Sequence, residues 1–294
     1  MSDVAAKADF AARAASNRRL AFVRHMLSHK GFVIGAAMTI LMTAIAIIAP
    51  FLMSDSPLTL NVRHRFSPPS EQFFFGTDHY GRDVFVRVVY GAGLSLSLGL
   101  WVVLCTGVLG TLVGTLSGYF RRIDSILMRL MDALMAFPSL MLAIAIAAAL
   151  GSGAANVVIA LSIAYAPRTA RIVRASVLMV RDAEYVEAAR LAGASHLRII
   201  FRHILPNSMA PLIIDLTFVF AYAVLAEAAL SFLGVGPPPP TPSWGNILAE
   251  GRDYVVDAPW ITTFPGLIIA FTVLGLNLFG DGLRDVLDPK LKTS

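Results

Sequence analysis

The stretch AANVVIALSIAYAPRTARI, residues 154–172, decides the topology of this chain. It begins as an apolar segment, but Pro167 and Arg168 interrupt it after about 13 apolar or small residues. A transmembrane helix needs about 20 predominantly apolar residues. The stretch therefore crosses a membrane only if Arg168 and Arg171 extend their long side chains to an interface. Whether it crosses sets the side of every later segment.

The composition of the chain is that of a polytopic membrane protein. Of its 294 residues, 56% are hydrophobic and 15% are charged, and the mean hydropathy is +0.70. These values exclude an ordinary soluble fold. The single cysteine, Cys105, excludes a disulfide framework and a cysteine metal site. Five further apolar runs approach or reach the length of a span, at residues 32–53, 94–120, 126–150, 212–233 and 261–279.

Lysine and arginine are distributed unevenly around these runs. If residues 154–172 span the membrane, the face that carries the amino terminus holds 19 of the 24 Lys and Arg. If they do not, the seven arginines between 168 and 202 change sides and the bias disappears. Because cytoplasmic segments are enriched in Lys and Arg, the sequence predicts an all-α integral membrane protein with six transmembrane helices and both termini in the cytoplasm. The net charge of +5 then belongs to the cytoplasmic face and does not indicate nucleic-acid binding.

This topology divides the chain into five parts. Residues 1–30 form a cytoplasmic amino-terminal segment, residues 31–53 an uncleaved first transmembrane helix, and residues 54–90 an external loop. Residues 91–281 form a core with five transmembrane helices and a cytoplasmic loop at 173–210, and residues 282–294 form a cytoplasmic tail. Within the second span, Gly110, Gly114 and Gly118 recur every four residues and predict a flat helix face for close packing.

A polar, arginine-rich segment at residues 185–206 stands out on the cytoplasmic side. Two short helical patterns follow one another, each with apolar or small residues at i, i+3, i+4 and i+7. In the first pattern these residues are Tyr185, Ala188, Ala189 and Ala192, and in the second they are Leu197, Ile200, Phe201 and Ile204. We expect Gly193 to end the first helix in a left-handed conformation, Ser195 to cap the second, and Pro206 to stop it.

These two helices have two candidate surfaces to lie against, the lipid and another protein. An alanine-rich face is a poor membrane anchor, since it lacks the bulky side chains of interfacial helices. Small residues beside an acidic side chain suit close docking into a protein groove. Docking is thus favoured over the lipid surface.

Four separated motifs resemble one known family. The first is the segment just described, with Glu187-Ala188-Ala189, then Gly193, then Leu205-Pro206, which resembles the E-A-A…G…I-x-L-P loop of bacterial ATP-binding-cassette (ABC) importer permeases. His203 stands where that pattern has Ile. The others are FGTDxxGRDV at 75–84, LSFLG at 230–234 with PSWG at 242–245, and NxxGDGLRDxLDP at 277–289. Together they resemble the second, C-type permease subunit of the dipeptide/oligopeptide/nickel importer family, from about residue 20 onward.

The resemblance implies a role and a set of partners. The chain would form half of a translocation pathway in the bacterial inner membrane, beside a homologous permease, two cytoplasmic ATPases and an external solute-binding protein. ATP and Mg would be bound by the ATPases, because none of the four lysines of this chain follows a glycine and no phosphate loop exists. The residues that would couple to an ATPase are Glu187, Ala188, Ala189, Gly193, Leu205 and Pro206.

Two carboxylates in the fifth span need an explanation of their own. Asp215 and Glu227 are expected to face the protein interior, because a carboxylate near the bilayer centre costs about 2.5–3.5 kcal/mol. The sequence leaves open whether they contact the substrate or hydrogen-bond across a subunit interface.

The sequence also leaves other functions open. The main alternative is a secondary transporter or channel that works without ATP, although no inverted repeat is evident. A membrane enzyme is less favoured, because no catalytic set and no set of metal ligands is recognisable. Among family substrates, which include dipeptides, longer peptides, nickel complexes and glutathione, a di- or oligopeptide is the expected class.

Overall fold

The computed structural model describes residues 26–53 and 55–287. Within this part of the chain the fold is helical, and the only β-pairing is an isolated bridge between Thr77 and Asp83. The helices are α2 (Lys30–Leu52), α3 (Val84–Tyr119), α4 (Arg121–Met135), α5 (Ser139–Leu150), α6 (Ala154–Arg181), α7 (Glu184–Leu191), α8 (His196–Ile199), α9 (Leu205–Phe232), α10 (Trp244–Gly251) and α11 (Trp260–Leu287). Short turns η1 (Val62–His64) and η3 (Arg252–Tyr254) are 3₁₀-helical, and η2 (Ile200–Ile204) is π-helical.

Most of the predicted spans appear as helices, several of them longer than expected. Four stretches are long and apolar enough to cross a membrane, namely α2, α3, His196–Phe232 and α11. Helix α3 begins at Val84, so the end of the predicted loop 54–90 is helical. Helix α11 continues to Leu287, beyond the predicted boundary at 281, while residues 1–25 and 288–294 of the predicted cytoplasmic segments lie outside the described residues.

The prediction of one continuous span over residues 126–150 is wrong. The chain forms two helices there, α4 and α5, bent by 89° at a short break. Pro138 lies at the break and has no N–H to continue the helical hydrogen bonds. Helix α4 also carries Asp124, Arg129 and Asp132 among its apolar residues, so it has a polar face that a straight span would expose to lipid.

The doubtful stretch at residues 154–172 is part of a long helix. Helix α6 runs for 28 residues and passes through Pro167 and Arg168 without ending. It is not among the helices apolar enough to span by composition. However, three of its arginines form ion pairs with carboxylates: Arg168 with Asp215, Arg171 with Asp132, and Arg174 with Asp124. The charges on α6 are therefore partnered inside the chain.

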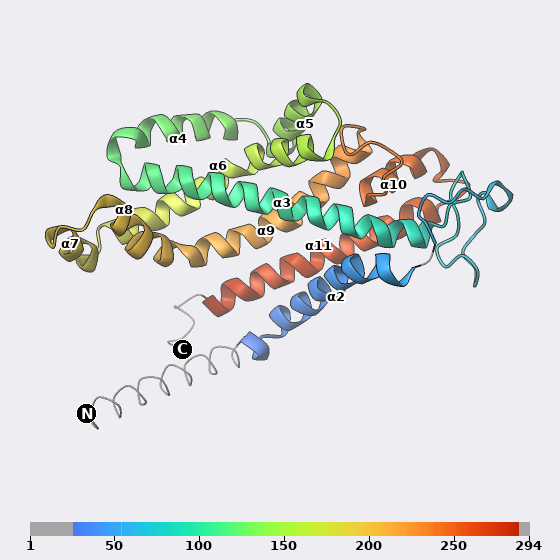
Figure 1. Cartoon of the computed structure of the whole chain (residues 1–294), viewed down its shortest axis with the longest axis horizontal. Coiled ribbons are helices and arrows are strands. Elements are labelled where there is room, and N and C mark those ends of the chain that lie inside the picture. The colour runs from blue at the N-terminus through green and yellow to red at the C-terminus, as the bar shows by residue number, and fades with distance from the viewer. Residues whose placement is uncertain (1–25, 54, 288–294) are drawn as a thin grey trace.

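Close packing of α3 against α6 forms the centre of the bundle (Figure 1). Gly110, Gly114 and Gly118 all face α6, and an added Cβ on Gly114 would lie 2.5 Å from the Ala170 carbonyl oxygen. Helix α2 packs on α11 in the same way, since an added Cβ on Gly35 would lie 2.2 Å from the Phe279 nitrogen. Small residues thus set both helix pairs at short distances.

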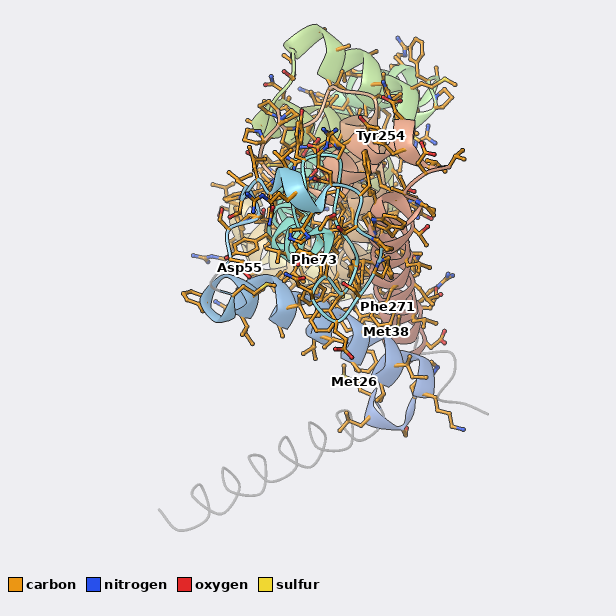
Figure 2. The ribbon with its side chains drawn as sticks, turned by 90° about the vertical axis from the view of Figure 1, so that its right-hand side faces the viewer. Met26, Met38, Asp55, Phe73, Tyr254 and Phe271 are labelled. Atoms are coloured by element: carbon orange, nitrogen blue, oxygen red, sulfur yellow. The ribbon has the colours of Figure 1, made fainter. Side chains whose placement is uncertain are left out.

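The bundle has two ends of different character. Helices α7 and α8 lie at one end, with the start of α2 and the end of α11 nearer this end than the other (Figure 1). We call this the α7 end. The opposite end carries the loop 55–83 and α10, and we call it the α10 end. Figure 2 turns the α10 end toward the viewer, with Phe73 of the loop and Tyr254 of η3 in front of the helices.

Candidate functional site

The segment from α7 to η2 forms a helical hairpin at the α7 end. Gly193 has φ +80°, in the left-handed region, and its N–H donates to the Arg190 carbonyl oxygen at 3.0 Å. The Ser195 side chain accepts a hydrogen bond from Arg198 N at 3.4 Å and caps α8. The predicted turn at Gly193 and the predicted cap at Ser195 are both confirmed. The hairpin geometry follows from local residue chemistry.

The prediction that Pro206 stops the second helix is wrong. The π-helical turn η2 passes directly into α9, and Leu205 N–H donates to the Ile200 carbonyl oxygen. Pro206 is the second residue of α9 and directly follows the π-helical turn, and the helix passes through it without ending. The second helix of the hairpin is therefore continuous with the transmembrane helix that follows it, and the segment is not a loop at its carboxy-terminal end.

One side of the hairpin packs on the bundle and the other is free. Val186 and Ile199 are fully buried, in a cluster with residues of α3, α6 and α9. In the second helix, Ile200 and Ile204 are buried as the pattern predicts, but Leu197 and Phe201 are 68% and 67% exposed. The expected alanine face of α7 is largely exposed, together with Glu187: Tyr185, Ala188 and Ala192 are exposed and Ala189 is half-buried. This free face is available to a partner.

Two contacts that sequence reasoning missed lie at the end of α3, one with the hairpin and one with the end of α6. Tyr119 Oη lies 2.8 Å from His196 Nδ1, at the start of α8. Arg181 Nη1 donates to the Gly118 carbonyl oxygen at 2.7 Å. His203, the residue that departs from the motif, has its ring 6.1 Å from that of Tyr185. The contact between Tyr119 and His196 thus holds the hairpin to α3, in addition to the chain connections to α6 and α9.

The two carboxylates of α9 face the protein interior, as expected, and are held within this chain. Glu227 is fully buried and accepts hydrogen bonds from Ser95 Oγ at 3.0 Å and Ser231 Oγ at 2.8 Å. Asp215 is 3% exposed; its Oδ2 accepts from Thr169 Oγ1 at 2.7 Å, and its Oδ1 lies 3.3 Å from Arg168 Nε. Glu227 therefore joins α9 to α3, whereas Asp215 joins α9 to α6.

A buried cluster of charges lies at the α10 end. Asp78 and Arg87 are fully buried, and Arg87 Nη1 lies 2.9 Å from Asp78 Oδ2 and 2.7 Å from Glu250 Oε2. Arg82 bonds the same two carboxylates, and its Nε lies 2.6 Å from Asp78 Oδ2. The two guanidinium groups balance the charges of the two carboxylates, so these four side chains carry no net charge. Their contacts connect the loop before α3 to α10.

This cluster explains the FGTDxxGRD motif at residues 75–83. Gly81 has φ +75°, and an added Cβ would lie 1.8 Å from the Asn61 carbonyl oxygen. The Thr77 carbonyl oxygen accepts from Trp260 Nε1 at 3.0 Å, and Asp83 caps α3 by accepting from Phe85 N at 2.7 Å. The motif therefore shapes the loop and anchors it to α11 as well as to α10.

The same cluster includes a possible set of metal ligands. Asp78, His79 and Glu250 place ligand atoms within 4.8 Å of one another. Both carboxylates are already bonded to Arg82 and Arg87, whose positive charges oppose a cation. Burial lowers the pKa of His79 below its ordinary value of 6.5. We assign no metal to this cluster.

Comparison with known sequences identifies the class of protein. The chain belongs to the family of binding-protein-dependent transport system inner membrane components, which matches residues 108–293. Residues 19–69 match the N-terminal TM domain of oligopeptide transport permease C. The chain is therefore a permease subunit of the ABC importer class, and the resemblance inferred from the four motifs is confirmed.

Individual relatives extend the match to nearly the whole chain. The chain is 56% identical to a putative peptide transport system permease protein of Brucella abortus, over 92% of this chain and 91% of the relative. It is 44% identical to the di/tripeptide transport system permease protein of Pseudomonas aeruginosa, over 93% and 92%. The inward-facing MetNI methionine ABC transporter shares the fold, with a TM-score of 0.57 at 18% identity, over 75% of this chain and 100% of that chain.

Proposed function

We propose that this chain is one of two membrane-spanning permease subunits of an ATP-driven importer of di- or oligopeptides in a bacterial inner membrane. A homologous permease would complete the pathway, two cytoplasmic ATPases would bind ATP and Mg, and an external binding protein would deliver the peptide. The observation that carries this proposal is the free face of the α7 hairpin in a chain of this family. The names of its peptide-transporting relatives support the substrate class.

We assign six spans, to α2, α3, the α4–α5 pair, α6, α9 and α11. Helix α6 has 28 residues, which correspond to about 42 Å at about 1.5 Å per residue, and ion pairs neutralise three of its arginines. Six spans bring the start of α2 and the end of α11 to one face, in agreement with their positions toward the α7 end (Figure 1). The bias of Lys and Arg then makes the α7 end cytoplasmic.

The α7 hairpin is the surface we assign to an ATPase. Glu187 and the small residues Ala188 and Ala189 form its docking side, and Gly193 sets the angle between α7 and α8. Leu205 and Pro206 join the hairpin to α9. At the opposite end, the rigid loop 55–83 and α10 would face the external binding protein.

A co-purification experiment tests this proposal. The chain is expressed with the subunits encoded beside it, and ATPase activity is measured in lipid nanodiscs with and without a binding protein and dipeptide. We expect Ala188→Trp to lose the ATPases, because a bulky side chain separates docked surfaces. Val256→Trp, at a residue 93% exposed near the α10 end, should retain them. An ATP-independent uptake by the isolated wild-type chain would contradict the proposal.

A further inference from the structure

A cavity of about 530 Å³ opens where the break between α4 and α5 faces α6 and α9. Its wall is mostly apolar, with residues such as Met135, Phe137 and Val219. Four polar side chains interrupt this wall: Ser139 at the start of α5, Tyr165 and Arg168 of α6, and Tyr222 of α9. A mainly apolar cavity with a few convergent polar groups has the character of a binding site for a small molecule.

Arg168 is the single charged residue in this wall. It lies near the middle of the 28-residue helix α6, and its side chain is 53% exposed. Its Nε lies 3.3 Å from Asp215 Oδ1, and its guanidinium carbon lies 5.9 Å from the centre of the Tyr222 ring. Among the residues that the structure describes, no acceptor bonds either terminal nitrogen. Asp215 therefore lies beside Nε and the Tyr222 ring lies near the guanidinium, while the edge with the two terminal nitrogens is free of acceptors among the described residues.

The other arginines on this side of α6 differ from Arg168. Arg171 and Arg174 each use a terminal nitrogen to bond a carboxylate of α4, at 2.5 Å and 2.6 Å. Neither lines the cavity. Arg168, Arg171 and Arg174 follow one another at intervals of three residues along α6, and carboxylates of α4 pair with the last two. Helix α4 ends at Met135, and the cavity begins there, beside Arg168.

The surroundings favour a water-filled path over a lipid surface. An exposed cation in the middle of a spanning helix is costly against hydrocarbon and is usually found facing a bundle interior or a polar cavity. A broken helix is tolerated at membrane depth where its freed backbone groups are buried or line a cavity. Both features, Arg168 and the break at residues 136–138, meet at the same cavity.

We propose that this cavity is the share of the peptide path contributed by this chain, and that the free edge of Arg168 binds the terminal carboxylate of a passing peptide. A guanidinium edge matches the two oxygens of a carboxylate. Tyr165 and Tyr222 provide flat apolar walls for peptide side chains of different size. A single ionic contact also binds weakly enough to release the peptide again, which conduction requires. This inference rests on the proposed function.

The test compares a peptide acid with its amide. A dipeptide with a free terminal carboxylate and the same dipeptide as a carboxamide are taken up by the complete transporter in proteoliposomes. We expect Arg168→Gln to reduce the ratio of acid to amide uptake about tenfold, and Arg168→Lys to reduce it less. Arg171→Gln, one turn further along α6 and outside the cavity, should leave the ratio unchanged. Any preference of the binding protein itself is common to all variants and cancels between them.

A labelling experiment gives a second measurement. In a Cys105→Ser background, the Arg168→Cys variant should react with a small water-soluble thiol reagent, and the peptide acid should slow this reaction. A thiol that does not react, or that only anionic lipid protects, would show that the cavity faces lipid. If the wild type takes up the peptide and the acid-to-amide ratio in Arg168→Gln is unchanged, the inference is overturned. Absence of ATP-dependent peptide uptake by the wild type would instead overturn the proposed function.

Discussion

Alanine substitutions at Gly193 and Gly234 test whether the turn at Gly193 transmits ATPase activity to transport. Gly234 is the control, because the same substitution there distorts a similar turn outside the hairpin. Both glycines end a helix in the same way, with φ +80° and +81°. An added Cβ meets nothing within 4 Å at either position. The four hydrogen bonds of the two turns all measure 3.0 Å, and they are Gly193 N to Arg190 O, Ala194 N to Ala189 O, Gly234 N to Ser231 O, and Val235 N to Leu230 O. The two sites therefore form a matched pair at opposite ends of the bundle.

The local cost of the substitution should be equal at the two glycines. A left-handed conformation costs an alanine about 1–2 kcal/mol, and no steric clash adds to this at either site. The population of each turn then falls about 5- to 30-fold relative to alternatives. Only Gly193 lies in the hairpin that we assign to the ATPase. Gly193→Ala should lower both peptide-stimulated ATPase activity and peptide uptake. Gly234→Ala should leave the coupling of ATP hydrolysis to uptake intact.

Two further substitutions at position 193 sharpen this prediction. Gly193→Asn should retain most activity, because asparagine tolerates the left-handed region better than alanine. Gly193→Pro should abolish coupling, because proline fixes φ near −65° and removes the N–H that bonds Arg190. ATP hydrolysis and uptake are measured on equal amounts of assembled complex. Equal losses in Gly193→Ala and Gly234→Ala would show that the turn matters only for folding, and full transport by Gly193→Pro would refute its role.

Three other predictions concern stability. Gly114→Ala should destabilise the bundle by about 1–3 kcal/mol, because the added methyl group overpacks the contact between α3 and α6. Gly266→Ala is the control, since an added Cβ there meets nothing within 4 Å, and it should not lower the midpoint of thermal unfolding. Equal midpoints for the two variants would contradict the close packing of α3 on α6. Arg87→Met should cost about 3–5 kcal/mol, since Arg82 alone then faces two carboxylates and one negative charge in the buried cluster is unbalanced. Denaturant titration measures this cost, and a Glu250→Gln substitution that restored no stability in the same background would contradict the explanation. Burial lowers the pKa of His79 from 6.5, so the unfolded state binds the proton more readily than the folded state. The contribution of neutral His79 to the free energy of unfolding should therefore be complete above about pH 6.5 and be lost as the pH falls through the folded pKa. A His79→Gln variant that shows the same decline would disprove this origin.

The hydrophobic runs predicted the location of most helices, because bilayer thickness imposes a length on apolar segments. The same reasoning failed at residues 126–150, where it counted apolar residues and ignored their arrangement. Asp124, Arg129 and Asp132 make α4 amphipathic, and Pro138 marks its break from α5. These signals were present in the sequence. A helical-periodicity test over residues 121–150 detects this polar face in α4 and its absence in α5.

The pairing of distant charges was beyond sequence reasoning. Asp215 pairs with Arg168, and Glu250 pairs with Arg87, across large separations in the chain. No local pattern tells which carboxylate a buried arginine meets, because the folded bundle alone brings the two together. For the same reason, the sequence analysis found the FGTDxxGRD motif but could not tell that its residues contact a distant helix. Its Arg82 bonds Glu250 of α10, which lies 168 residues later in the chain.

Because the helix does not end at Pro206, a movement of the hairpin would be transmitted to the membrane-spanning part of α9. A loop between α8 and α9 would absorb part of any displacement. Instead, η2 passes into α9 without a break, so a push on α8 acts along the helix that carries Asp215 and Tyr222. Asp215 bonds Thr169 and pairs with Arg168 on α6, and α9 thereby connects the proposed ATPase surface to the cavity wall. Pro206, which the sequence pattern placed at a helix end, thus lies inside the continuous helix that connects the proposed ATPase surface with the cavity.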